Sequence, residues 1–92
     1  MSSIQEIRTL ELRLTDIVDD YIAQRYNEDD VLAIGLRCGR VTVKADSRDK
    51  IKVGKTTTIY PLKELVRIGD DGNPESDCDQ ISEIANSWLF LD

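Results

Sequence analysis

Gly54-Lys55-Thr56 has the residue types that end a phosphate-binding P-loop. In that motif the glycine that corresponds to Gly54 is preceded, five residues earlier, by another glycine. A helix must also follow, so that its free amide groups and its dipole meet the phosphate. Asp49 stands where the first glycine should be, and the residues after Thr56 are β-branched or aromatic, which favours a strand. The sequence therefore predicts no nucleotide site here and no bound cofactor.

Residues 70–79 hold the densest group of oxygen ligands. The acids are Asp70, Asp71, Glu75, Asp77 and Asp79. A calcium loop places acidic side chains at alternating positions before a glycine, but Gly72 and Pro74 interrupt that pattern here. Acids at the start of a helix are also explained by capping and by the helix dipole. We therefore expect helix capping rather than a metal site.

Nucleophilic chemistry lacks a base in this chain. There is no histidine, and the two cysteines, Cys38 and Cys78, are far apart. Arg37 and Arg40 flank Cys38, but a nucleophilic thiol also needs a base beside it. An enzyme is therefore the most distant of the functions that we consider, and we assign no catalytic residue. Two separated cysteines are too few for a disulfide scaffold, which favours a reducing, cytoplasmic location.

The elements that would position these residues follow from hydrophobic periodicity. Apolar residues recur at three- and four-residue spacing from Ile4 to Ile22, and Ser3 with Glu6 fits a capping box. We therefore predict a helix over residues 3–26. Leu12 lies off the apolar stripe of this helix, and we expect it to be exposed.

The middle of the chain changes to a period of two, which is typical of strands. Alternating residues surround a tight turn at Cys38-Gly39, and β-branched residues lead up to Tyr60. We therefore predict a β-meander over residues 31–60. Pro61 ends its last strand, because proline has no N–H to donate.

Residues 61–76 are predicted to form a short helical turn and a loop, from their proline, glycine and aspartate content. A second helix is predicted over residues 77–90, from the apolar stripe Ile81, Ile84, Ala85 and Trp88. The chain is thus predicted to be a single small α+β domain over residues 1–92, in the order α-β-β-β-(short helical turn)-α. We expect a three-stranded antiparallel sheet with both helices packed on one face.

Charge is distributed unevenly along the chain, whose net charge is −6. Residues 1–30 carry eight acids and three arginines, residues 31–67 nine bases and three acids, and residues 68–92 seven acids and no base. We expect four apolar residues to face the helices: Val41, Val43, Ile51 and Val53. Alternation then turns four bases outward: Arg40, Lys44, Lys50 and Lys52. The outer sheet face is predicted to be basic, and flat at Ala33 and Gly35.

This basic face is either a solvated surface that discourages edge pairing or a contact surface for an acidic partner, including a second copy of the chain. The apolar segment Trp88-Leu89-Phe90-Leu91 would bury further area in the core or in a homodimer. Our leading interpretation is a non-enzymatic interaction or regulatory module that acts through protein–protein contacts. A phage or mobile-element accessory protein or inhibitor is one form that such a module takes.

Nucleic-acid binding through the same four bases is the alternative interpretation. The net negative charge and the lack of aromatic residues on that face argue against it. The element order is shared with double-stranded-RNA-binding domains, but those present lysines at the start of the last helix, where this chain has Ser76-Asp77-Cys78-Asp79. With no long apolar run and no secretory signal at the N-terminus, we expect no membrane contact.

Overall fold

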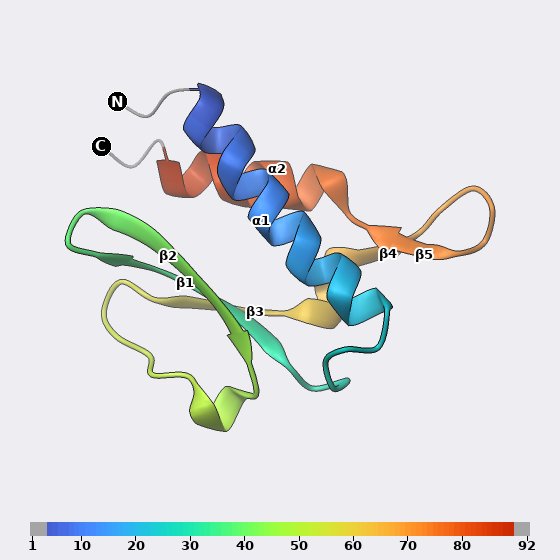
Figure 1. Cartoon of the computed structure of the whole chain (residues 1–92), viewed down its shortest axis with the longest axis horizontal. Helices are drawn as coiled ribbons and strands as arrows, with labels where there is room; N and C mark the ends of the chain where they lie inside the picture. The colour runs from blue at the N-terminus through green and yellow to red at the C-terminus, as the bar shows by residue number, and fades with distance from the viewer. Residues whose placement is uncertain (1–3, 90–92) are drawn as a thin grey trace.

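The computed structural model describes residues 4–89. Within this range the chain forms two α-helices, five short strands and two 3-10 helices (Figure 1). In chain order they are α1 (Ile4–Ile22), β1 (Val31–Arg37), β2 (Arg40–Asp46), η1 (Arg48–Lys50), β3 (Thr58–Pro61), η2 (Leu62–Leu65), β4 (Val66–Ile68), β5 (Pro74–Ser76) and α2 (Cys78–Leu89). The predicted α+β class and the order α-β-β-β-α are confirmed.

Helix α1 forms because one of its faces carries apolar residues at helical spacing. The buried residues of this face are Ile7, Leu10, Leu14 and Val18. The helix ends at Ile22, short of the predicted end at residue 26. Gln24 takes a left-handed φ of 63°, and two backbone hydrogen bonds of 3.0 and 2.9 Å close the last turn in a Schellman motif. The predicted capping residue, Ser3, lies outside the described residues.

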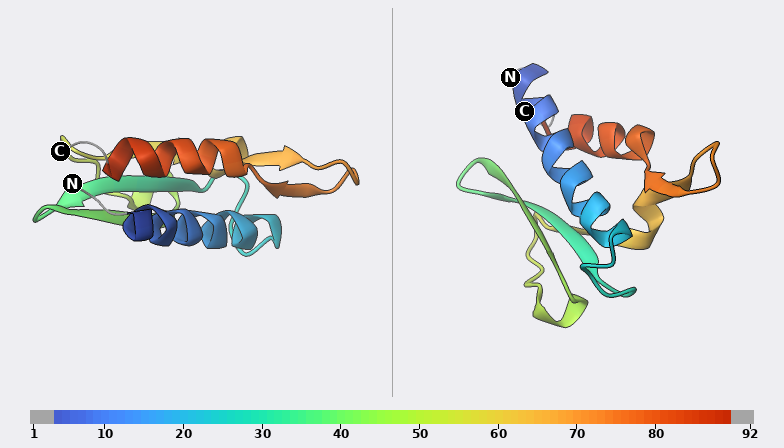
Figure 2. Two further views of the ribbon diagram at one scale, coloured as in Figure 1. Left: turned by 90° about the horizontal axis from the view of Figure 1, so that it is seen from above. Right: turned by 45° about the vertical axis from the view of Figure 1, so that its right-hand side comes forward.

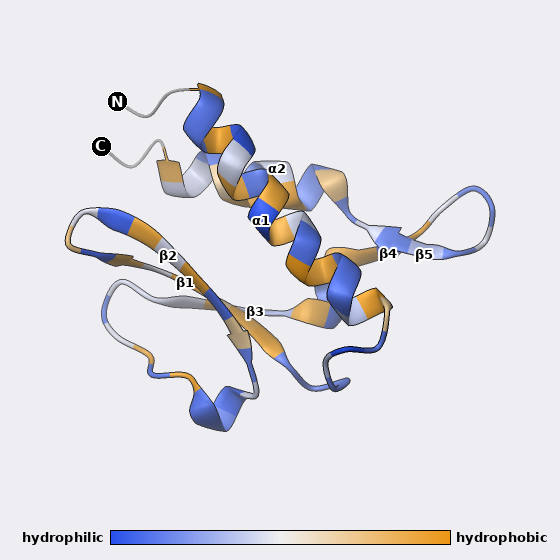
Figure 3. Cartoon of the chain, in the orientation of Figure 1, coloured by the Kyte–Doolittle hydropathy of each residue, from blue (hydrophilic) through white to orange (hydrophobic). Residues whose placement is uncertain are grey.

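Strand β1 occupies the centre of the three-stranded antiparallel sheet, whose order is β2-β1-β3. The predicted β-meander is therefore wrong, because a meander would place β2 in the centre. Residues 31–35 of β1 are all buried, so this strand needs cover on both faces and partners on both edges. Figure 3 shows the first half of β1 as hydrophobic and η1 as hydrophilic.

Both helices lie side by side on one face of the sheet, as predicted (Figure 2). The core beneath them takes side chains from both helices, from β1 and from η2. Leu14, Leu32, Leu62 and Ile81 are among its most deeply buried members, each at most 1% exposed. Val41 and Val43 of β2 pack against the same core, as predicted, so that Arg40 and Lys44 project from the opposite face.

Residues 61–76 contain more structure than the predicted helical turn and loop. After η2, strands β4 and β5 form a separate two-stranded sheet, with Val66 opposite Ser76 and Ile68 opposite Pro74. A backbone hydrogen bond of 2.9 Å from Gly69 to Asn73 closes the hairpin between them. The glycine- and aspartate-rich composition therefore marks a hairpin turn between two short strands, the first of which, Val66–Ile68, is a segment whose residue types already suggest an extended backbone.

Helix α2 begins at Cys78, one residue after the predicted start, and Leu89 is its last described residue. Of the two α-helices described, neither has the length and apolarity required to cross a bilayer.

Candidate functional site

The four bases predicted to face outward are all exposed, but they come from two kinds of segment. Arg40 and Lys44 lie on the outer face of β2, as predicted. Lys50 ends η1, and Lys52 lies in the irregular chain that follows it. The prediction that Lys52 lies in a strand is therefore wrong, and the strand alternation used to orient Lys50 and Lys52 does not apply to them.

Residues 47–57, here called the cover segment, close the second face of the sheet. Ile51 is 8% exposed and forms a small cluster with Val31, Ala33 and Ile59. The prediction that Ile51 faces the helices is therefore wrong. Val53, also predicted to face them, is 61% exposed. The apolar residues on the outer face of β1 explain this arrangement, because an uncovered sheet would leave them in water.

The cover segment packs closely against β1 at Gly35. A Cβ atom on this glycine would lie 3.0 Å from the Thr57 hydroxyl oxygen and 3.4 Å from the Thr56 carbonyl oxygen. The Thr56 hydroxyl also donates a hydrogen bond of 3.2 Å to the Leu36 carbonyl. Ala33 and Gly35 are therefore buried, and the flat, open surface predicted around them does not exist.

The cover segment and the neighbouring β1–β2 hairpin form what we call the basic end, a cluster of exposed bases. These are Arg37, Arg40, Lys44, Arg48, Lys50, Lys52 and Lys55. Within residues 4–89, no ion pair joins any of them to a carboxylate. Arg37 and Arg40 are direct cross-strand partners, an arrangement that is destabilising for like charges. Two acids, Asp46 and Asp49, lie among these seven bases, so the basic end keeps an excess of five positive charges (7 − 2).

The turn that joins Arg37 to Arg40 is strained at its first residue. Cys38 has a φ of 53° and Gly39 a φ of 76°, so that both central residues are left-handed, as in a type I′ turn. Glycine accepts this conformation freely, whereas a cysteine does so at a cost. The predicted tight turn is confirmed, and it holds Cys38 exposed at the tip of the hairpin.

Tyr60, the aromatic residue of β3, packs against the core on the helix-facing side of the sheet. Its hydroxyl accepts a hydrogen bond of 3.2 Å from the indole N–H of Trp88. Trp88 and Leu89 are both half-buried against the core, so these two residues of the predicted apolar segment contribute to the fold. Phe90 and Leu91 lie outside the described residues. Leu12 is 65% exposed, as predicted.

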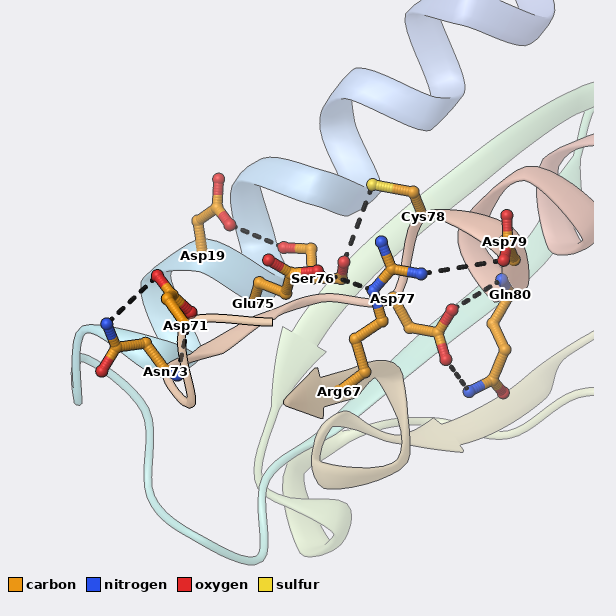
Figure 4. Close-up of polar contacts among 10 residues, drawn as sticks. All are labelled: Asp19, Arg67, Asp71, Asn73, Glu75, Ser76, Asp77, Cys78, Asp79 and Gln80. Carbon is orange, nitrogen blue, oxygen red and sulfur yellow. Dashed lines mark hydrogen bonds and ion pairs between the residues drawn. The ribbon is translucent and has the colours of Figure 1, made fainter. Parts of the chain in front are cut away.

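At the opposite end of the molecule, acids gather around the β4–β5 hairpin and the start of α2 (Figure 4). Arg67 lies 2.8 Å from a Glu75 carboxylate oxygen and 3.7 Å from one of Asp79, and these two acids raise its pKa, chiefly through the hydrogen bond to Glu75. The Ser76 hydroxyl donates a hydrogen bond of 2.6 Å to Asp19, which ties β5 to α1. These contacts are structural, and they hold the hairpin against the two helices.

Asp77 caps α2. Its carboxylate accepts hydrogen bonds from the Gln80 backbone N–H at 3.2 Å and from the Gln80 side-chain amide at 2.8 Å. These bonds hold the pKa of Asp77 below its ordinary value. In the adjoining turn, two hydrogen bonds from Asn73 likewise lower the pKa of Asp71. Among residues 4–89 no three histidine, cysteine or acidic side chains are placed to hold a metal ion.

A groove that sequence reasoning missed lies between the end of α1 and the β4–β5 hairpin. It measures about 290 Å³, and its apolar lining is Tyr21, Ile22, Tyr26, Val66 and Pro74. Gln24 and Glu28 complete the lining. The only sequence signal was the apolar residues near the end of the first predicted helix, which were interpreted as its continuation.

Comparison with known proteins gives no match to this chain among protein families, curated protein sequences or solved structures.

Proposed function

We propose that this chain is a non-enzymatic interaction module that binds an acidic protein surface through its basic end. The observation that carries the proposal is the excess of seven exposed bases over two acids at this end, with Arg37 and Arg40 held directly opposite each other. A carboxylate-bearing partner would relieve that repulsion and form charge-assisted hydrogen bonds.

The bases are attached to packed segments of the chain, and this arrangement also supports an interaction surface. Ile51 anchors the cover segment between Lys50 and Lys52, so two bases flank a buried residue and are held at the surface. Lys44 lies opposite Ala33, which belongs to the same apolar cluster. A preorganised cluster loses less side-chain entropy on binding than bases on a free tail.

A protein partner fits the composition of this surface better than a nucleic acid. Residues 37–57 contain no aromatic side chain on which a base would stack. We place the module in the cytoplasm, a proposal supported by two exposed, free cysteines.

Affinity capture with three forms of the chain tests the proposal. The first is wild type, the second is Arg40→Gln/Lys44→Gln/Lys52→Gln, and the third is the matched control Arg8→Gln/Arg13→Gln/Lys63→Gln. All six positions are exposed, and both variants lose the same charge. We expect wild type and control to capture the same proteins from the source cell, and the second form, here called the basic-end variant, to lose them. Each captured protein, once purified, should bind directly to purified wild type. Identical capture by all three forms would refute the proposal.

Nucleic acid remains the alternative partner, and the same three forms test it. Fluorescence anisotropy with labelled single-stranded and duplex probes at low salt would detect such binding. If wild type bound a probe with an affinity that falls steeply with salt, and the basic-end variant did not bind it, the partner would be a nucleic acid rather than a protein.

A further inference from the structure

The groove beside the β4–β5 hairpin has an apolar lining and lies in an acidic part of the surface. Tyr21 and Tyr26 line it from the α1 side, and Val66 and Pro74 line it from the hairpin. Glu28 belongs to the lining, and Asp29 follows it in the same exposed turn. No hydrogen bond or ion pair engages either carboxylate within residues 4–89. The groove thus offers apolar area together with negative charge.

The tip of the β1–β2 hairpin has the complementary character. Arg37 and Arg40 carry its charge, and Leu36, beside Arg37, is 38% exposed although it is a large apolar residue. The two-residue turn at Cys38-Gly39 makes this tip narrow. Because successive strand residues point to opposite faces, Leu36 lies on the helix-facing side of this tip and the two guanidinium groups lie on the outer side.

We infer that the groove is the docking site for the β1–β2 hairpin tip of a second copy of this chain. The inference rests on the proposed function, since it names a second copy as an acidic partner of the basic end. Leu36 would enter the apolar part of the groove from one face of the narrow tip, while the long side chains of Arg37 and Arg40 would reach Glu28 and Asp29 from its other face. Both partners bury apolar area that is exposed in the single chain, and both neutralise charges that lack partners.

The net charge of −6 does not prevent this contact. The molecule is 39 Å long, and the tip of the β1–β2 hairpin lies toward the opposite end of that axis from the β4–β5 hairpin and the end of α1, whose residues line the groove (Figure 1). Charges are screened beyond about 8–10 Å at physiological ionic strength. Each end therefore acts through its own local charge, and the basic end of one copy attracts the acidic end of the next.

The placement of the two surfaces also determines the form of the assembly. Tip and groove are different patches at opposite ends, so the contact is heterologous, and it leaves a free tip and a free groove after each addition. We expect weak, salt-sensitive, head-to-tail association that grows with concentration and does not stop at a symmetric dimer.

Two half-blocked variants test the inference without polymerisation. Arg37→Glu/Arg40→Glu keeps the groove and removes the tip charge, whereas Glu28→Gln/Asp29→Asn keeps the tip and removes the groove charge. All four positions are exposed, and a heteronuclear NMR spectrum checks that each variant folds. Each variant alone should sediment as a monomer at low salt. A mixture should form a one-to-one heterodimer, because one intact tip and one intact groove remain.

NMR titration then maps the contact. With the tip variant labelled and the groove variant added, shifts should be confined to residues around Tyr21, Tyr26 and Val66. With the labels exchanged, they should be confined to residues 36–41, and about 0.5 M salt should weaken the complex at least tenfold. A mixture that stays monomeric at millimolar concentration, or shifts located elsewhere, would overturn the inference. If the basic end still captured other proteins, the proposed function would hold although the self-association does not. If neither self-association nor capture were observed, the inference and the proposed function would both be rejected.

Discussion

Truncating Ile51 to alanine is the most direct test of how the basic end is built. Ile51 is the main buried residue of the cover segment, 8% exposed against Val31 and Ala33. Replacing a buried isoleucine by alanine costs about 2–5 kcal/mol, and least where the surroundings can close around the gap. Because the segment after η1 is irregular and can relax toward the sheet, we expect the free energy of unfolding to fall by about 2 kcal/mol.

Urea denaturation, followed by the fluorescence of Trp88, measures this loss. Val53→Ala is the matched control, because Val53 lies two residues further along the same segment but is 61% exposed. Its truncation should change the free energy of unfolding by less than about 0.5 kcal/mol. If Ile51→Ala proved as stable as Val53→Ala, the cover segment would not be packed on the sheet, and the arrangement of Lys50 and Lys52 would lose its physical basis.

Two further predictions concern local backbone and capping. Cys38→Asn should raise the free energy of unfolding by about 0.5–1 kcal/mol, because asparagine tolerates the φ of 53° better than cysteine. Cys78→Asn, in an ordinary helical position, should give no such gain in the same urea titration. Asp77→Ala should cost about 1 kcal/mol near neutral pH through the lost cap of α2. Since the pKa of Asp77 is lowered on folding, its charge stabilises the fold above the ordinary value of 3.8, and this contribution disappears as the pH falls through the lower folded-state pKa. Wild type should therefore lose more stability than Asp77→Ala between about pH 5 and pH 2, and equal losses would contradict this role.

The helices were predictable because their signals are local. The spacing of Ile7, Leu10, Leu14 and Val18 determines the buried face of α1 whatever else the chain does. The end of α1 was not predictable in the same way. Its Schellman motif places Gln24, rather than a glycine, in the left-handed region, while the apolar residues beyond it belong to the groove and imitate a continuing stripe.

The strand order was harder to predict because it depends on contacts between distant segments. Val31 to Leu36 is an apolar run without a polar residue on either face, and such a run is typical of a central strand with both faces buried. That signal competes with the rule that consecutive strands tend to be neighbours. Here burial prevails: β3 pairs with β1, and the intervening residues cross the outer face, where Ile51 covers Val31 and Ala33.

This path changes what kind of surface the bases form. On an open meander, the four predicted bases would stand on strands, and their positions would depend on the sheet alone. On the observed chain, Arg40 and Lys44 stand on a strand, whereas Lys50 and Lys52 depend on the packing of one isoleucine between them. Local opening of the cover segment therefore disperses part of the basic end without unfolding the sheet. Binding through the basic end must then stabilise the cover segment, and a partner that engages Lys50 and Lys52 should slow amide exchange in residues 47–57 more than in α1.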